Sequence, residues 1–114
     1  MKKNSKIFLA GSSGLVGSAI YRKLKSFGYK NIITTKRRNL NFLNKEKTEI
    51  FLRKKKPDYV IIASAKVGGI FSNNAFPADY IYQNLAIELN LINEAYLAGV
   101  KNLLFLGSSC VYPK

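Results

Sequence analysis

Three glycines near the start of the chain, Gly11, Gly14 and Gly17, have the spacing Gly-x-x-Gly-x-x-Gly. They follow the apolar run 7–10 and open an amphipathic segment, so backbone N–H groups and the positive end of a helix dipole would meet at one point. The first glycine would allow a tight turn, the second a close approach of a diphosphate, and the third close packing of the helix. Because the dipole contributes only about 0.3–1 kcal/mol per charge, several N–H donors must share the binding. We expect a dinucleotide diphosphate to lie against Gly11, Ser12, Ser13, Gly14, Leu15, Val16 and Gly17; the alternative is a glycine-rich turn without a ligand.

The stretch 34–39, which follows a second apolar run, indicates which nicotinamide cofactor would bind. It contains Lys36, Arg37 and Arg38, and no acidic residue occurs between the glycine loop and Glu46. In dinucleotide folds an acid after the second strand hydrogen-bonds the adenosine ribose and selects NAD. A guanidinium such as that of Arg37 instead grips a 2′-phosphate with two hydrogen bonds. The sequence therefore predicts NADP(H) over NAD(H), unless these cations are simply solvated.

Strand and helix signals alternate along the chain and would position these residues. Apolar runs predict strands at 7–10, 32–35, 59–63 and 103–106, the first buried on both faces. Helical spacing predicts helices at 15–27, 45–55 and 79–97, with Asn44 as a cap and Gly28, Pro57 and Gly99 as stops. The alternation predicts an α/β fold, the N-terminal half of a Rossmann-type doubly wound parallel sheet. We expect residues 1–114 to be a truncated NADP-binding domain that lacks a C-terminal substrate domain.

Three sets of apolar residues are predicted to line helix faces. The first helix should carry Leu15, Ile20, Leu24 and Phe27 at helical spacing, and the second should turn Ile50, Phe51 and Leu52 partly inward. On the third, Ile81, Leu85, Leu89 and Ile92 share one face.

Length, charge and cysteine content exclude several classes of protein. The 114 residues suit one domain at most. No apolar run approaches the length of about 20 residues that spans a bilayer, and the single cysteine, Cys110, fits a reducing compartment, so we expect a cytoplasmic protein without a membrane segment. The net charge is +13, and sixteen of the 19 basic residues precede Asp58. We interpret these as lysines on solvated faces and disfavour nucleic-acid binding, because no stacking aromatic residue or fold motif lies beside them in the sequence.

Three parts of the chain carry a specific resemblance: 63–70, then 73–74 with 77–84, and 103–114. With them the chain resembles the GDP-L-fucose synthase family, within the extended short-chain dehydrogenases/reductases, along essentially its full length. The resemblance implies an NADPH-dependent enzyme that epimerises GDP-4-keto-6-deoxy-mannose at C3 and C5 and reduces it at C4. It also implies a GDP-sugar substrate and a homodimer.

The resemblance also assigns roles to residues. Ser108 corresponds to a catalytic serine that hydrogen-bonds the C4 carbonyl, where a donor stabilises developing charge. Cys110 corresponds to a residue that transfers a proton during epimerisation, and a thiol with a pKa near ~8.5 is tunable for that work. The implied cofactor contacts beyond the glycine loop are Arg37, Arg38, Asn39, Leu40, Asn41, Phe42, Ala63, Ala65, Asn84, Leu106, Gly107, Ser108 and Ser109.

The sequence departs from the family pattern in two respects. The Tyr-x-x-x-Lys motif that donates a proton does not follow Ser108, and the chain contains no histidine to pair with Cys110. Losing a general acid costs about 10²–10⁴ in rate, so we expect the chain to be a fragment that is inactive alone. Two alternatives stay open: another sugar-nucleotide epimerase or dehydratase of the same superfamily, and a non-catalytic module that binds nucleotides or polyanions.

Overall fold

The computed structural model describes residues 2–35, 40–63 and 77–106, without the side chains of residues 77, 79–81 and 84. Seven elements follow one another along the chain: β1 (Ile7–Ala10), α1 (Leu15–Ser26), β2 (Ile32–Ile33), α2 (Lys45–Lys55), β3 (Tyr59–Ile62), α4 (Pro77–Leu97) and β4 (Asn102–Phe105). Within the described residues the predicted alternation of strands and helices is confirmed. The boundaries differ by at most two residues, and β2 is two residues shorter than expected.

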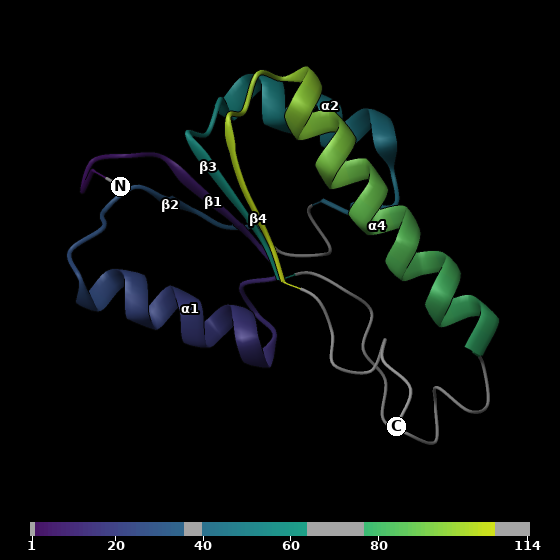
Figure 1. The fold of residues 1–114 in the computed structure, drawn as a ribbon, viewed down its shortest axis with the longest axis horizontal. Coiled ribbons are helices and arrows are strands. Elements are labelled where there is room, and N and C mark those ends of the chain that lie inside the picture. The colour runs from purple at the N-terminus through teal and green to yellow at the C-terminus, as the bar shows by residue number, and fades with distance from the viewer. Residues whose placement is uncertain (1, 36–39, 64–76, 107–114) are drawn as a thin grey trace.

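The strands form one parallel sheet in the order β2-β1-β3-β4. Helix α1 covers one face of this sheet, whereas α2 and α4 lie side by side on the other (Figure 1). Right-handed crossovers require this arrangement, because the chain moves outward from β1 to β2 and then returns past β1 to β3 and β4. The fold is therefore the predicted doubly wound α/β sheet.

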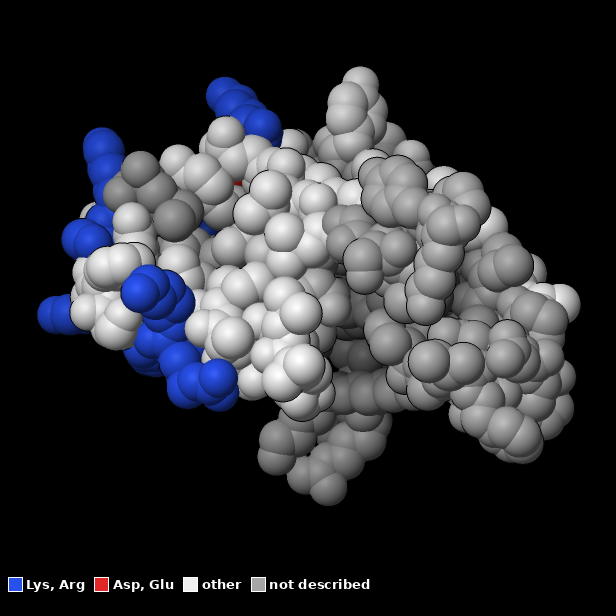
Figure 2. Space-filling view, turned by 60° about the horizontal axis from the view of Figure 1, so that its bottom comes forward, with Lys and Arg blue, Asp and Glu red and all other residues white. Residues whose placement is uncertain are grey.

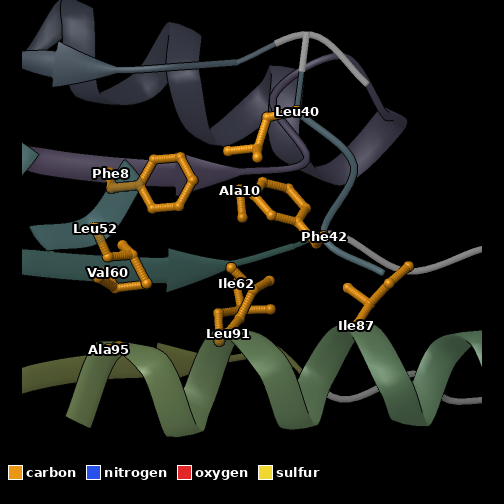
Figure 3. Close-up of a cluster of buried hydrophobic side chains, with 10 residues drawn as sticks. All are labelled: Phe8, Ala10, Leu40, Phe42, Leu52, Val60, Ile62, Ile87, Leu91 and Ala95. Carbon is orange, nitrogen blue, oxygen red and sulfur yellow. The ribbon is translucent and has the colours of Figure 1, made fainter. Parts of the chain in front are cut away.

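The central strand β1 is fully buried because both of its faces are covered. Ile7 and Leu9 point toward α1 and pack with Leu24, while Phe8 and Ala10 point toward α2 and α4. The larger core lies on the α2 and α4 side, where strand and helix side chains interdigitate (Figure 3). Its members are Phe8, Ala10, Leu40, Phe42, Leu52, Val60, Ile62, Ile87, Leu91 and Ala95.

The helix ends follow the predicted chemistry. The side chain of Asn44 accepts a hydrogen bond from the Lys47 N–H at 3.0 Å, as expected of an N-cap. Gly28 and Gly99 have positive φ values of 90° and 86° where α1 and α4 end, a conformation that favours glycine.

The predicted helix faces are only partly correct. On α1, Leu24 is buried and Ile20 is partly buried, but Leu15 and Phe27 are exposed; on α2, Leu52 is buried and Ile50 is exposed. On α4, the residues that face the sheet are Ile87, Leu91 and Ala95, whereas Leu85, Leu89 and Ile92 lie outside it. The residues predicted to share one face of α4 therefore lie on the face that points away from the sheet. Helix α4 is apolar on two sides, so the spacing alone did not identify the buried one.

Glu94 on α4 is a buried acidic residue that is only 1% exposed. Neither of its Oε atoms has a hydrogen-bond partner within the part of the chain that the structure describes. A buried polar group without a partner destabilises a fold by about 1–3 kcal/mol. Replacing Glu94 with leucine is therefore expected to raise the free energy of unfolding by about that amount, measured as a higher urea midpoint with an unchanged slope.

Asn93→Leu is the matched control for this substitution, because it adds the same leucine at an exposed position of α4. We expect it to change the free energy of unfolding by no more than about 0.5 kcal/mol. A loss of stability in Glu94→Leu would contradict the assignment of Glu94 as an unpartnered group.

Candidate nucleotide-binding site

The glycine loop lies at the switch point of the sheet, where the order of the strands reverses. Strand β1 is followed along the chain by β2 on one side, and β3 pairs with β1 on the other. In open α/β sheets, ligands bind outside the carboxyl ends of the strands at such a switch point. The Ala63 N–H donates to the Ala10 carbonyl at 2.9 Å, and the Leu106 N–H donates to the Ile62 carbonyl at 3.1 Å. Gly11, Ala63 and Leu106 therefore lie along the same edge of the sheet.

Each of the three glycines has a different structural environment. Gly11 has a φ of 87°, which confirms the expected tight turn after β1. A Cβ on Gly17 would lie 1.8 Å from the carbonyl oxygen of Gly11 and 2.6 Å from its carbonyl carbon. A Cβ on Gly14 would make only an ordinary contact of 3.6 Å with the same oxygen. The third glycine is therefore required by packing of α1 on the loop, whereas the second leaves its backbone open.

The N-terminus of α1 is well suited to an anion. Gly14 is the N-cap residue in an extended conformation and provides no side chain to cap the helix, and the first turn contains no acidic residue. The N–H of Ser18 donates to the Gly14 carbonyl at 2.9 Å, so the earlier amides of the first turn have no intrahelical acceptor. These donors and the helix dipole together favour a phosphate.

Apolar side chains flank this anion site. Leu15 is 89% exposed, and Val16 beside it is also exposed. Ser12 is half-buried and Ser13 is exposed in the loop itself. The site thus combines amide donors with the exposed apolar side chains of Leu15 and Val16. This combination fits the diphosphate and the neighbouring rings of a dinucleotide.

The segment 40–43 forms part of the core next to the site. Leu40 and Phe42 are buried, and the Phe42 ring meets the Phe8 ring edge to face at 5.9 Å. Asn41 is exposed, and its side chain accepts a hydrogen bond from the Leu43 N–H. Because the Leu40 and Phe42 side chains fill the core, Asn41 is the most exposed of the three described residues of this segment that the resemblance implies as cofactor contacts. Their contact with a cofactor stays a prediction.

Asn90, a residue that no sequence pattern singled out, holds this segment in place. The Asn90 side chain on α4 donates a hydrogen bond to the Phe42 carbonyl at 2.7 Å. The two residues are 48 positions apart, so no local sequence signal predicts the bond.

Several predicted site residues lie outside the described residues: Arg37, Arg38, Asn39, Ala65, Gly107, Ser108, Ser109 and Cys110. Asn84 belongs to the described backbone of α4, but its side chain is not described. The roles of all these residues stay predictions.

The parallel sheet, its switch point and the glycine loop define a nucleotide-binding α/β domain of the Rossmann type. Residues 7–114 match the NAD dependent epimerase/dehydratase family, and the chain belongs to that family.

Relatives within this family are more specific. The chain is 54% identical to GDP-L-fucose synthase 1 of Arabidopsis thaliana over 98% of its own length and 35% of that protein. The solved structure of DdhaC superimposes with a TM-score of 0.96 at 54% identity, over 100% of this chain and 33% of that one. The structure of MlghC, a GDP-mannoheptose C4 reductase from Campylobacter jejuni with NADP bound, gives a TM-score of 0.92 at 37% identity, over 99% of this chain and 36% of that one. The chain thus spans about a third of the length of each.

No helix among the described residues has the length and apolar character needed to cross a membrane.

Proposed function

We propose that this chain is the NADP(H)-binding, N-terminal part of an enzyme of the GDP-L-fucose synthase type. The observation that carries the proposal is the uncapped N-terminus of α1 behind a glycine loop at the switch point of the sheet. Two comparisons support it: 54% identity to a plant GDP-L-fucose synthase and a TM-score of 0.92 to a reductase solved with NADP.

The proposed cofactor contacts follow from the site. Amides of the loop and of the first turn of α1 would hold the diphosphate, with Leu15 and Val16 along its apolar side. Arg37, assisted by Arg38, would bind the 2′-phosphate through its guanidinium. The cofactor, when bound, would supply the hydride for reduction at C4.

Two further residues would act on the substrate, a GDP-linked 4-keto sugar. Ser108 would donate a hydrogen bond to the C4 oxygen as negative charge develops there. The thiol of Cys110 would move protons at C3 and C5, a role that needs the free thiol of a reducing compartment such as the cytoplasm. The remaining proton donors would come from residues that this sequence does not contain, so we propose that the chain alone has no epimerase or reductase activity.

A second candidate function is the reduction of a related GDP-linked keto sugar without epimerisation. The likeness to the GDP-mannoheptose C4 reductase favours it. Both candidates share the GDP-sugar class and reduction at C4, and the fate of the C3 and C5 hydrogens distinguishes them.

We further propose that the outer face of α4 joins two copies of the chain in a homodimer. Tyr82, Leu85, Leu89, Ile92 and Tyr96 are exposed and recur at intervals of three and four residues. They form one continuous stripe, which lies opposite the core-facing residues Ile87, Leu91 and Ala95. We call it the outer stripe. Exposed apolar stripes of this kind mark interaction sites.

The cations of this strongly basic chain are absent from the helix that would form the contact. Helix α4 contains no lysine or arginine, although the chain carries 19 of them. Burial raises the pKa of Glu88 on this helix above its ordinary value. Two copies of α4 can therefore approach without bringing cations together.

The cofactor proposal is tested by titrating the chain with NADPH and NADH in a calorimeter. We expect NADPH to bind at least about tenfold more tightly, because one charged hydrogen-bonded contact contributes about 1.5–3 kcal/mol. Arg37→Ala should remove most of this preference and leave NADH binding unchanged. Equal affinities for the two cofactors would contradict the proposal.

A further inference from the structure

Positive charge gathers at the end of the molecule where the parallel strands begin. Four segments lead into the strands at this edge: residues 2–6, 27–31, 56–58 and 98–101. Hydrogen bonds between them, such as Asn31 Nδ2 to the Asn4 carbonyl and Lys6 N to Asp58 Oδ2, both 2.8 Å, hold the edge together. These segments and the last turns of α1 and α2 carry most of the cations of the described residues. This basic end consists of Lys2, Lys3, Lys6, Lys23, Lys25, Lys30, Arg53, Lys54, Lys55, Lys56 and Lys101.

The basic end has little to neutralise it. Asp58 is the only acidic residue in the four segments, and its carboxylate accepts the backbone N–H of Lys6. Arg53 pairs with Glu49 at 3.3 Å. The C-termini of α1 and α2 each offer roughly half a negative charge, far less than the cations around them. Figure 2 shows the Lys and Arg side chains clustered at one end of the molecule. Mutual repulsion there would be relieved by a polyanion.

An aromatic side chain lies among these cations. Phe27 is 55% exposed, and the Nζ atoms of Lys3 and Lys23 lie 5.9 and 5.1 Å from its ring centroid. Lys3 also donates a hydrogen bond to the Phe27 carbonyl. Phe27 is only four positions from Lys23 in the sequence, whereas Lys3, 24 positions away, reaches the ring only in the fold. An exposed aromatic ring therefore does lie beside the lysines, contrary to the prediction from the sequence.

We propose that the basic end binds single-stranded nucleic acid, with backbone phosphates on the lysines and a base stacked on Phe27. Positively charged grooves with exposed aromatic rings bind single strands in this way. A single exposed ring suits a base better than a membrane, which would require a larger apolar surface. The basic end also lies at the opposite edge of the sheet from the glycine loop, because all strands run in parallel. Nucleic acid and dinucleotide therefore occupy separate sites.

The test is fluorescence anisotropy of a labelled oligouridylate of about 12 nucleotides titrated with the chain. If about four phosphates are neutralised, the affinity falls about 50-fold between about 50 and about 200 mM salt. Lys3→Glu combined with Lys23→Glu should weaken binding at least about tenfold and reduce the salt dependence. Phe27→Ala should weaken binding about tenfold with the salt dependence unchanged, because it removes a stacked base and no charge.

Lys45→Glu combined with Lys47→Glu is the matched control. It changes the net charge by the same amount in the first turn of α2, at the other edge of the sheet, where acidic residues suit the helix dipole. We expect less than about a twofold loss of affinity from it. Equal losses from the two double substitutions, or an unchanged affinity in Phe27→Ala, would overturn the proposal. Displacement of the oligonucleotide by NADPH would also overturn it, because the dinucleotide site would then be the site of binding.

Discussion

Replacing Gly17 with alanine is expected to lower the free energy of unfolding by about 3 kcal/mol or more. The new Cβ would lie 1.8 Å from the Gly11 carbonyl oxygen and 3.1 Å from the Ser12 Cα. These are backbone atoms of a tight turn, so they cannot move aside as a flexible side chain would. Helix α1 would have to shift away from the loop and lose its contacts with β1. Urea denaturation followed by circular dichroism measures the loss.

Gly14→Ala is the matched substitution three residues earlier. Its Cβ would make a 3.6 Å contact, and Gly14 has a φ of −76°, which alanine adopts readily. We expect stability to change by no more than about 1 kcal/mol, because alanine restricts the unfolded chain but is a poorer N-cap residue than glycine. NADPH binding should nevertheless fall at least about tenfold, since the methyl group would stand where the diphosphate approaches. Equal stability of Gly17→Ala and wild type would contradict the packing role. Unchanged NADPH affinity in Gly14→Ala would contradict the proposed position of the diphosphate.

The sequence predicted the order of elements well because its signals are local. The run 7–10 is uniformly apolar, and a strand with both faces covered has to be so. Asn44 and Gly28 predicted helix ends because capping involves residues only a few positions apart. The glycine loop was predictable for the same reason, since its turn and its helix contact lie within seven residues.

Other features of the site depend on contacts between distant residues. The bond from Asn90 to the Phe42 carbonyl joins α4 to the segment before α2. The burial of Leu40 and Phe42 depends on how α4 covers the sheet. Charge clustering at the basic end likewise depends on the parallel topology, because four separate segments contribute to it. No periodicity in the sequence carries this information.

Helix α4 shows where hydrophobic periodicity is ambiguous. The spacing predicts that Leu85, Leu89 and Ile92 share one face, and they do. The sheet, however, packs against the opposite stripe, which contains Leu91. A helix with one apolar stripe identifies its buried face. A helix with two apolar stripes does not identify its buried face. Which stripe is buried depends on the sheet against which the helix packs.

Replacing a leucine of α4 with alanine is expected to affect stability very differently on the two apolar stripes of the helix. Leu91 is 0% exposed and Leu89 is 64% exposed. Leu91→Ala should lower the free energy of unfolding by about 2–5 kcal/mol, as expected for a cavity in a packed core. Leu89→Ala should change it by no more than about 0.5 kcal/mol when the chain is dilute. Urea denaturation at low protein concentration measures both, because association would otherwise add to the apparent stability.

The dimer dissociation constant of each variant shows whether the outer stripe is a dimer contact or is only exposed to solvent. If the outer stripe joins two copies, Leu89→Ala should raise the dimer dissociation constant about tenfold or more in sedimentation experiments. Leu91→Ala should leave that constant within about twofold under conditions where the variant stays folded, because its side chain does not reach the outer surface. An unchanged dissociation constant in Leu89→Ala would show that copies meet elsewhere. A large loss of stability in Leu89→Ala at low concentration would show instead that the outer stripe packs within the monomer.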